Sequence, residues 1–318
     1  MIPLPTKKIL VIVGPTASGK TRLAVELAKE HNGEVVSADS MQIYRGMDIG
    51  TAKPTRAEMD GVPHHMLDVA DPWEDFSVAR YVEMAAACVD GILSRGRLPI
   101  VAGGTGLYVD SLLSGRTFAA FSPESSLRKE LEAELAERGG AAMLEQLAQA
   151  DPETAARLHP NDHKRIVRAL EVYRSTGKTI SEHNRETKLL PPRYHALTIG
   201  LNFRERAHLW ERIDRRVDQM AADGLEEEVR RLLSSGLPRT CTAMQAIGYK
   251  EFTAALDGEM SWEEALELVK LRTRQYAKRQ LTWFRRSPDT HWLLWEEHPN
   301  FGNARQRSTE LLREFGVG

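Results

Sequence analysis

Short, continuous runs of apolar residues mark several strands along this chain. Each run is bounded by glycine, proline or polar residues and lacks the polar–apolar alternation of a strand with one solvent-facing side. Such runs predict buried strands at 7–13, 34–38, 98–102, 195–203 and 291–295. Between them, apolar residues recur at helical spacing, as in 21–29 and 77–95. Alternating strands and helices are typical of an α/β fold with a mainly parallel sheet flanked by helices.

The middle of the chain has a different pattern. From about Gly115 onward no strand-like run occurs for many residues, and 122–172 is helical throughout. The apolar runs resume only at His195. We therefore expect a small all-helical insertion domain at 116–194, within an α/β core formed by 1–115 and 195–318.

Capping signals divide this helical region. Ser122-Pro123-Glu124 is expected to begin a helix, because serine is a favoured N-cap and proline a favoured first helical residue. Gly139-Gly140 interrupts that helix, and a further helix is expected at 163–173. The stretch 177–192 is predicted to be a mobile loop.

The last third of the chain is predicted to be largely helical after the strand at 195–203. One helix carries an apolar stripe of Leu209, Ile213, Val217 and Met220, and a second covers 225–233. A basic segment at 270–286 also keeps helical spacing of its apolar residues. The tail after Asn300 is predicted to be a polar helix.

The stretch from Gly14 to Thr21 fits the phosphate-binding pattern G-x-x-x-x-G-K-[ST]. A predicted strand precedes it and a predicted helix follows, which is the context the motif requires. The two glycines let successive backbone N–H groups face an anion, and the helix N-terminus and Lys20 add positive charge. The Thr21 hydroxyl can bind Mg²⁺. A plain glycine-rich turn is the disfavoured alternative, so we expect binding of a phosphate or diphosphate ester.

Asp39 follows the second predicted strand. The carboxyl ends of parallel strands meet at one edge of a sheet, so Asp39 is expected to face the same crevice as the glycine-rich loop. A carboxylate there can accept a proton from a nucleophile or bind Mg²⁺. The alternative is an aspartate that only caps a helix or a turn.

A second glycine-rich turn, Gly103 to Gly106, follows the strand at 98–102 and should lie beside the first loop. Tight packing of helix against strand explains such a turn equally well. His64 and His65 could lie in a short strand. A metal site there is disfavoured, because neighbours on a strand point to opposite faces.

Composition is that of a water-soluble globular protein, with 42% hydrophobic and 28% charged residues among 318. The two cysteines are far apart in sequence, which disfavours a disulfide or zinc site and suits a reducing cytoplasm. No apolar run approaches the ~20 residues of a membrane span. Formal net charge is −2, so any nucleic-acid binding must depend on local positive charge.

Two segments supply such local charge. Lysine and arginine outnumber acids in 164–193, and 270–286 contains no acid at all. Aromatic residues lie among the cations of the second segment, which favours a track for a polyanion over a solvated basic face.

Taken together, these motifs resemble one family, the bacterial tRNA dimethylallyltransferases, also called tRNA isopentenyl transferases. The resemblance covers nearly the whole chain, in the family's order. The matching stretches are GPTASGKT (14–21), SADSMQIYRGMDIGTAKP (37–54), GGTGLY (103–108), HPND with KRIVRALEVYRSTGK (159–178), RIDRRV (212–217), QAIGYK (245–250) and RQYAKRQLTWFR (274–285).

The resemblance implies a reaction. The dimethylallyl group of dimethylallyl diphosphate would move to N6 of the adenosine 3′-adjacent to the anticodon (position 37), in tRNAs that read codons beginning with U. It implies a P-loop NTPase-like core and a requirement for Mg²⁺. The partners would be the anticodon stem-loop of tRNA and dimethylallyl diphosphate, with no membrane, and we expect a monomer. The target base would be flipped out of its stack to react.

Roles for individual residues follow from the motifs and the resemblance together. Diphosphate binding and catalysis are expected of Gly14, Pro15, Thr16, Ala17, Ser18, Gly19, Lys20, Thr21, Asp39 and Arg216. Thr21 is the expected Mg²⁺ ligand, with Asp39 as a second candidate. RNA contacts are expected of Asp39, Ser40, Met41, Gln42, Thr105, Arg128, Lys164, Arg165, Ile166, Val167, Arg168, Gln245, Ala246, Ile247, Gly248, Tyr249, Lys250, Lys278 and Arg279.

Three other functions share some of these features. A small-molecule or nucleotide kinase would use the same loop with ATP, but it needs no basic segments. An isopentenyl transferase acting on free AMP has no need for a basic helical insertion. A P-loop RNA-binding switch protein would form no prenylated product.

Overall fold

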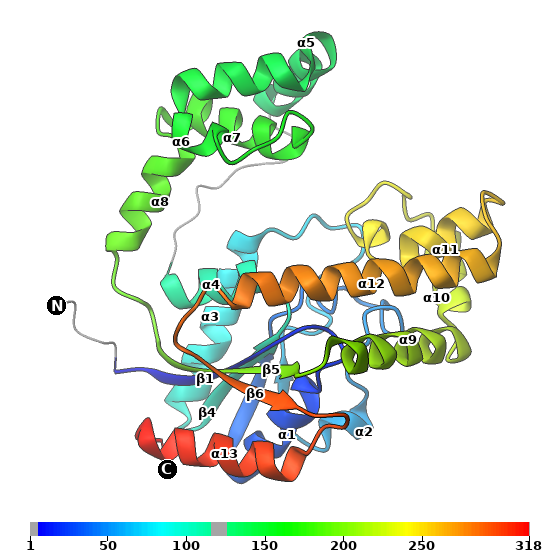
Figure 1. Ribbon diagram of the computed structural model, residues 1–318. Helices are drawn as coiled ribbons and strands as arrows, with labels where there is room; N and C mark the ends of the chain where they lie inside the picture. Colours follow the sequence, from blue (N-terminus) through cyan, green and yellow to red (C-terminus); the bar gives the residue numbers. More distant parts are fainter. Residues whose placement is uncertain (1–5, 116–125, 318) are drawn as a thin grey trace. The chain divides into compact units, whose positions relative to one another are not determined.

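The computed structural model describes residues 6–115 and 126–317 (Figure 1). Its single sheet has six strands, all paired in parallel in the order β3-β2-β4-β1-β5-β6. The strands are β1 (Lys8–Val13), β2 (Gly33–Ser37), β3 (His64–His65), β4 (Leu98–Gly103), β5 (His195–Phe203) and β6 (Thr290–Trp295). The prediction of an α/β fold with a mainly parallel sheet is confirmed. The helix start expected at Ser122 lies outside the described residues.

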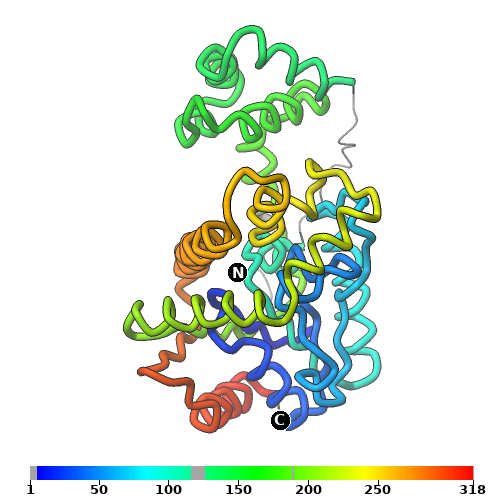
Figure 2. Tube along the Cα trace, turned by 90° about the vertical axis from the view of Figure 1, so that its right-hand side faces the viewer, coloured from blue at the N-terminus to red at the C-terminus, as the bar shows by residue number. Residues whose placement is uncertain are grey.

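Helices cover both faces of this sheet. Those of the core are α1 (Lys20–Glu30), α2 (Arg56–Met59), α3 (Val78–Ser94), α4 (Gly106–Ser114), α9 (Arg206–Ala222), α10 (Leu225–Ser234), α11 (Tyr249–Leu256), α12 (Trp262–Phe284) and α13 (Phe301–Glu314), with a 3₁₀ turn η1 (Ala243–Gln245). Helices α1 and α13 pack against each other on one face, and α3 packs on β2 and β4 from the other (Figure 1). Helices α9 and α12 lie side by side in both views (Figure 1 and Figure 2).

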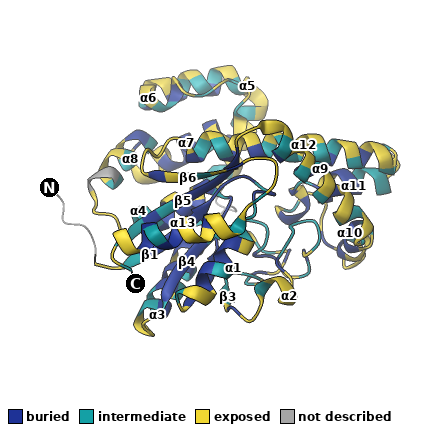
Figure 3. Ribbon diagram, turned by 60° about the horizontal axis from the view of Figure 1, so that its bottom comes forward, coloured by how far each residue is buried: buried dark blue, intermediate teal, exposed yellow. Residues whose placement is uncertain are grey.

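The central strand β1 explains why the apolar runs are continuous. Five of its six residues are buried, because helices cover both sides of the sheet (Figure 3). Leu10 pairs with Ile100 of β4 on one side and with Leu197 of β5 on the other. Apolar side chains therefore face a core above and below the sheet, as the sequence pattern requires.

Three strands end at the same edge of the sheet. In the register Val13 lies beside Gly103, and Ser37 lies beside Ala102. The segments that follow β1, β2 and β4 therefore meet outside their carboxyl ends, where open parallel sheets bind ligands. These segments are the loop from Gly14 to Thr21, the turn at Asp39 and the turn at Gly103.

The described residues divide into two compact units, one of which lies within Ser114–Pro192. This unit contains α5 (Ser126–Ala150), α6 (Pro152–Ala155), α7 (His163–Thr176) and α8 (Ile180–Leu189). It has its own core, in which Leu131, Met143, Leu147, Ile166 and Leu170 are buried. Gly139 has a φ of 76° and kinks α5 where the sequence predicted a break.

One local prediction in this unit is wrong. The stretch 177–192 was expected to be a mobile loop, yet it contains the helix α8. The Thr179 side chain accepts from the Glu182 backbone N–H, and the Glu182 side chain accepts from the Thr179 backbone N–H. This reciprocal capping box begins the helix, and the pattern T-x-x-E was its signal in the sequence. Among the described residues, no helix is long and apolar enough to cross a membrane.

Candidate active site

A cavity of about 460 Å³ lies at the carboxyl edge of the sheet, within the α/β unit. The loop after β1 contributes Thr16, Lys20 and Thr21, and the turn after β2 contributes Asp39, Ser40, Met41 and Gln42. Further walls come from the loop at 50–52, the turn at 102–104, α9, α12 and the segment before α11. Of the predicted residues these walls bring in Arg216, Gln245, Ala246, Ile247, Gly248 and Arg279.

The glycine-rich loop needs glycine at both ends. Gly14 has a φ of 149°, and a Cβ there would lie 2.4 Å from the Leu201 carbonyl oxygen. Gly19 has a φ of 93° immediately before α1. Side chains from outside the loop hold its carbonyl groups: Trp295 Nε1 donates to Ser18 at 2.8 Å, and Arg212 Nε donates to Ala17 at 3.1 Å. The conformation of the loop is thus fixed in advance of any ligand.

Lys20 is a half-buried cation that lines the cavity. Its Nζ donates to the Pro15 carbonyl at 2.7 Å. Burial and the positive charge of Arg216 lower the pKa of Lys20 to about 7, and the nearby Asp39 carboxylate opposes that shift. Burial also lowers the pKa of Arg216. Neither cation forms an ion pair among the described residues, so an anion of high charge is the ligand that would stabilise both.

The lowered pKa of Lys20 predicts a pH-dependent stability. Between pH 7 and the ordinary lysine pKa of 10.5, the unfolded chain holds a proton that the folded chain lacks, so stability rises with pH. From pH 7 to about pH 9, we expect the ligand-free protein to gain up to about 1.4 kcal/mol per pH unit relative to Lys20→Met. Chemical denaturation of both proteins measures this difference. Parallel stability curves would show that Lys20 titrates normally.

The two carboxylate oxygens of Asp39 can have different roles. Its Oδ1 accepts from the backbone N–H of Met41 at 2.9 Å and of Gln42 at 3.3 Å. The interpretation of Asp39 as a turn-capping aspartate is therefore correct for this oxygen. Neither of these bonds involves Oδ2, and the residue lines the cavity together with Lys20. One carboxylate can thus shape the turn and also act on a ligand.

The second glycine-rich turn packs against the Asp39 turn. A Cβ on Gly103 would lie 2.2 Å from the Ala38 carbonyl oxygen, so tight packing does explain this glycine. Thr105 Oγ1 accepts from the Ser40 backbone N–H at 3.0 Å and donates to Ser40 Oγ at 3.3 Å. Thr105 therefore lies directly behind the cavity wall that Ser40 forms.

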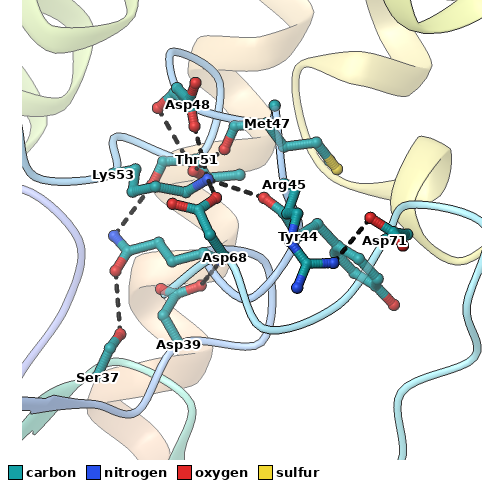
Figure 4. A network of polar contacts seen from close by, with 12 residues as sticks. Ser37, Asp39, Tyr44, Arg45, Met47, Asp48, Thr51, Lys53, Asp68 and Asp71 are labelled. Carbon is teal, nitrogen blue, oxygen red and sulfur yellow. Dashed lines mark hydrogen bonds and ion pairs between the residues drawn. The ribbon is translucent and has the colours of Figure 1, made fainter. Parts of the chain in front are cut away.

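The loop between β2 and β3 is held by buried polar side chains (Figure 4). Lys53 Nζ contacts Asp48 and Asp68 at 2.6 Å each, and only 6% of its side chain is exposed. Gln42 accepts from Ser37 Oγ and donates to the carbonyls of Thr51 and Ala52. The side chain of Gln42 thus anchors the loop that forms one cavity wall.

Tyr249 is a core residue and not an exposed aromatic. Its side chain is fully buried, and its hydroxyl donates to Glu228 at 2.5 Å. Glu228 in turn accepts from the backbone N–H groups of Asp48, Ile49 and Gly50. We therefore correct the expectation that the Tyr249 side chain contacts RNA, because it supports the loop instead.

The helical unit holds the other predicted RNA contacts. Lys164 and Arg165 are exposed on α7, and Arg128 and Arg168 both reach Glu171, at 3.6 and 2.8 Å. Ile166 and Val167 face the opposite way and are buried in the core of this unit. A side-chain contact of Ile166 or Val167 with RNA is therefore excluded, since helical periodicity turns them inward.

Fewer cations of the basic segment on α12 are available to a ligand than its sequence indicated. Lys270 pairs with Asp218 at 2.6 Å and Arg274 pairs with Asp214 at 2.7 Å, so both hold α12 to α9. Lys278 and Arg279 remain exposed, and Arg279 also lines the cavity. Asp214 and Asp218 lie on another helix, and Glu267, 2.8 Å from Lys270, lies just before the segment, so a count within 270–286 does not include these acids.

Two residues of α12 were missed by the sequence analysis. Tyr276 and Gln280 line the cavity. Burial and the Asp39 carboxylate raise the pKa of Tyr276 to about 12, against the effect of its hydrogen bonds to Thr105 and Gln280. Tyr276 and Gln280 are four residues apart, which places them on one face of the helix, toward the glycine-rich turns. This spacing was the available signal in the sequence.

Residues 42–287 match the family described as "IPP transferase", and residues 7–71 match the family described as "Isopentenyl transferase". A tRNA dimethylallyltransferase of Caldanaerobacter subterraneus is 49% identical over 96% of this chain and 97% of its own. A second relative, tRNA dimethylallyltransferase 1 of Pelobacter propionicus, is 52% identical over 91% of this chain and 93% of its own.

Solved structures agree with these relatives. The tRNA isopentenylpyrophosphate transferase of Bacillus halodurans has a TM-score of 0.72 and 43% identity, covering 97% of this chain and 98% of its own. A eukaryotic dimethylallyltransferase described as acting on tRNA has a TM-score of 0.83 and 32% identity, covering 98% of this chain and 79% of its own. The chain therefore belongs to the IPP transferase family, a family of transferase enzymes.

Proposed function

We propose that this protein transfers the dimethylallyl group of dimethylallyl diphosphate to N6 of the adenosine 3′-adjacent to the anticodon (position 37), in tRNAs that read codons beginning with U. One observation carries the proposal. A single cavity joins two half-buried cations, Lys20 at the end of the loop and Arg216 on α9, to the carboxylate of Asp39. The cations form one half of the site and can stabilise a diphosphate leaving group, while the carboxylate forms the other half and can accept a proton from a weakly acidic amine. The reaction needs both halves in one cavity. Membership of the family supports the choice of reaction.

The leaving-group half acts by stabilising charge. As the bond between C1 of the allyl group and the diphosphate oxygen breaks, its electron pair goes to the diphosphate. Lys20, Arg216 and the amides of the loop would face that growing charge and stabilise it. Apolar residues of the same cavity, including Ile213, Val217 and Val269, would pack against the dimethylallyl group.

The acceptor half of the cavity, which contains Asp39, acts on the N6 amine of the adenine. A bond forms between N6 and C1, and the nitrogen then loses a proton. Asp39 would accept that proton through Oδ2 while Oδ1 keeps the turn in place. The adenine cannot reach the cavity while stacked, so we propose that it is flipped out of the anticodon loop. Thr105 would support the Ser40 side of the adenine site.

Magnesium fits the oxygen atoms that line the cavity. The Thr21 hydroxyl and the Asp39 carboxylate both lie there, while the described residues contain no cluster of three acids, histidines or cysteines. Such a sparse protein contribution suits Mg²⁺, which usually binds through few protein ligands plus phosphate oxygens and water. Thr21 would hold the ion, with Asp39 as second candidate. When bound, the ion would neutralise part of the diphosphate charge.

RNA binding is assigned to two separate surfaces. The surface on the α/β unit consists of the exposed residues Gln245, Lys250, Lys278 and Arg279 together with the turn at 39–42. The surface on the helical unit consists of Arg128, Lys164, Arg165 and Arg168. Splayed loop bases are recognised by amides and cations of this kind. We propose a monomer in the cytoplasm that binds the anticodon stem-loop with both units.

Replacing Lys278 and Arg279 together by glutamine should weaken tRNA binding and reduce its salt dependence. For every phosphate that is no longer neutralised, the slope of log affinity against log salt should fall by about 0.7 to 0.9. Titration of labelled tRNA at several salt concentrations measures the slope. The matched control replaces Arg305 and Arg313, two exposed arginines of α13. Equal slopes in both double variants would show that α12 only presents a solvated basic face.

Labelled dimethylallyl diphosphate, offered with Mg²⁺ to unmodified tRNA or to free AMP, tests the proposed reaction. Label in tRNA alone is the expected result. Label in AMP would support the rival transferase acting on a free nucleotide. ATP hydrolysis without prenyl transfer would support the kinase, and RNA binding without any product would support the switch protein.

A further inference from the structure

One face of α12 contacts both glycine-rich segments of the active site. Three of its residues follow helical spacing: Tyr276, Gln280 and Trp283. Trp283 Nε1 donates to Asp110 Oδ2 at 2.9 Å, and a Cβ on Gly106 would lie 2.2 Å from the Trp283 ring. Tyr276 interacts with Thr105. The helix is therefore fitted along the segment that begins at Gly103.

Gln280 lies at the centre of this contact and has the most specific geometry. Its side-chain oxygen accepts from the Thr16 backbone N–H at 2.9 Å, and its side-chain nitrogen donates to the Gly104 carbonyl at 3.0 Å. Because one partner can only donate and the other can only accept, the amide has one orientation. Gln280 is 5% exposed. A Cβ on Gly104 would lie 2.1 Å from the side-chain nitrogen, so the fit leaves no spare room.

The two partners of Gln280 belong to opposite halves of the proposed reaction. Thr16 is part of the loop that would hold the diphosphate. Gly104 precedes Thr105, which hydrogen-bonds Ser40 in the turn that carries Asp39. The amide of Gln280 thus bridges the leaving-group half and the acceptor half. It occupies one backbone N–H of the loop that could otherwise face a phosphate.

We propose that Gln280 is a positioning residue that sets the spacing between the diphosphate and the acceptor adenine, an inference that rests on the proposed function. Reacting atoms must approach to about 3–3.5 Å, and a misplacement near 1 Å can cost about a hundredfold in rate. Gln280 touches neither reactant in this role. Its loss should therefore slow the chemical step and leave the binding of each substrate intact.

The test compares Gln280→Met with Gln275→Met. Methionine has similar volume but cannot make either hydrogen bond, and Gln275 is an exposed glutamine of the same helix. For Gln280→Met we expect kcat to fall about 10- to 100-fold, with the KM for both substrates nearly unchanged. Its affinity for inorganic diphosphate should match that of the control, whereas its melting temperature should fall because two buried hydrogen bonds are lost. Gln275→Met should retain full activity.

Gln280→Glu is the second variant. It keeps an acceptor for Thr16 and removes the donor to Gly104, but it also adds a negative charge beside the loop. It should also lose kcat. Full activity in both Gln280 variants, or loss of diphosphate binding in Gln280→Met, would overturn the positioning role. The wild-type protein separates this inference from the proposed function. If wild type forms no prenylated tRNA, the proposed function fails; if wild type and Gln280→Met react equally fast, only the positioning role fails.

Discussion

Asp39→Asn is expected to lower kcat for prenyl transfer about 10²- to 10⁴-fold, with tRNA affinity nearly unchanged. The asparagine side chain keeps a carbonyl oxygen that can accept from the backbone N–H groups of Met41 and Gln42, as Oδ1 of Asp39 does. The turn therefore retains its shape. The variant removes only the capacity of the other oxygen to take a proton from N6.

The contrast with Asp39→Ala makes this prediction sharper. Alanine removes the turn-capping oxygen as well, so the turn at 39–42 should loosen and tRNA affinity should fall in addition to kcat. Single-turnover transfer rates and tRNA titrations on both variants separate the two effects. Asp223→Asn, at an exposed aspartate after α9, serves as the control. Equal losses of affinity and rate in Asp39→Asn would exclude Asp39 as the base.

Lys20→Met is expected to reduce kcat/KM for dimethylallyl diphosphate by about 10²- to 10³-fold, because the variant lacks one of the two half-buried cations proposed to face the leaving group. The same substitution should stabilise the ligand-free protein near neutral pH. Lys20 is half-buried without an ion-pair partner among the described residues, and a methionine of similar length has no charge to desolvate. An inactive variant with a raised melting temperature is an outcome that simple misfolding cannot produce.

Lys29→Met is the matched control for this prediction. Lys29 lies on the same helix as Lys20, is exposed, and pairs with Asp60 at the surface. Its replacement should leave activity and diphosphate affinity unchanged. Isothermal titration with inorganic diphosphate and thermal denaturation of both variants provide the measurements. Retention of diphosphate affinity in Lys20→Met would remove Lys20 from the site.

The parts of the fold that the sequence predicted are those with local causes. The apolar runs of β1 and β4 are continuous because both faces of the sheet are covered. The loop from Gly14 to Thr21 is recognisable because its glycines have backbone angles or contacts that other residues tolerate poorly. Asp39 was found because it directly follows a predicted strand, and strand ends meet at one edge.

The parts that were missed depend on partners distant in sequence. Gln280 bridges Thr16 and Gly104, and a single sequence does not reveal either contact. Tyr249 was predicted to contact RNA because the stretch 245–250 resembles a family segment that contacts the anticodon loop, yet the buried Glu228 holds its side chain in the core. Lys270 was counted within a segment that contains no acid, yet it pairs with Asp218 on another helix and with Glu267 just before the segment. The capping box of α8 and the four-residue spacing of Tyr276 and Gln280 were local signals that could have been used.

The cavity is proposed to join dimethylallyl diphosphate to one adenosine of the anticodon loop. The most direct measurement compares two synthetic anticodon stem-loops that differ only at position 37, one with adenosine and the other with guanosine, which has no amine at that ring position. With labelled dimethylallyl diphosphate and Mg²⁺, we predict label in the adenosine stem-loop and none in the guanosine one. Label in both stem-loops, or in neither, would contradict the proposed reaction.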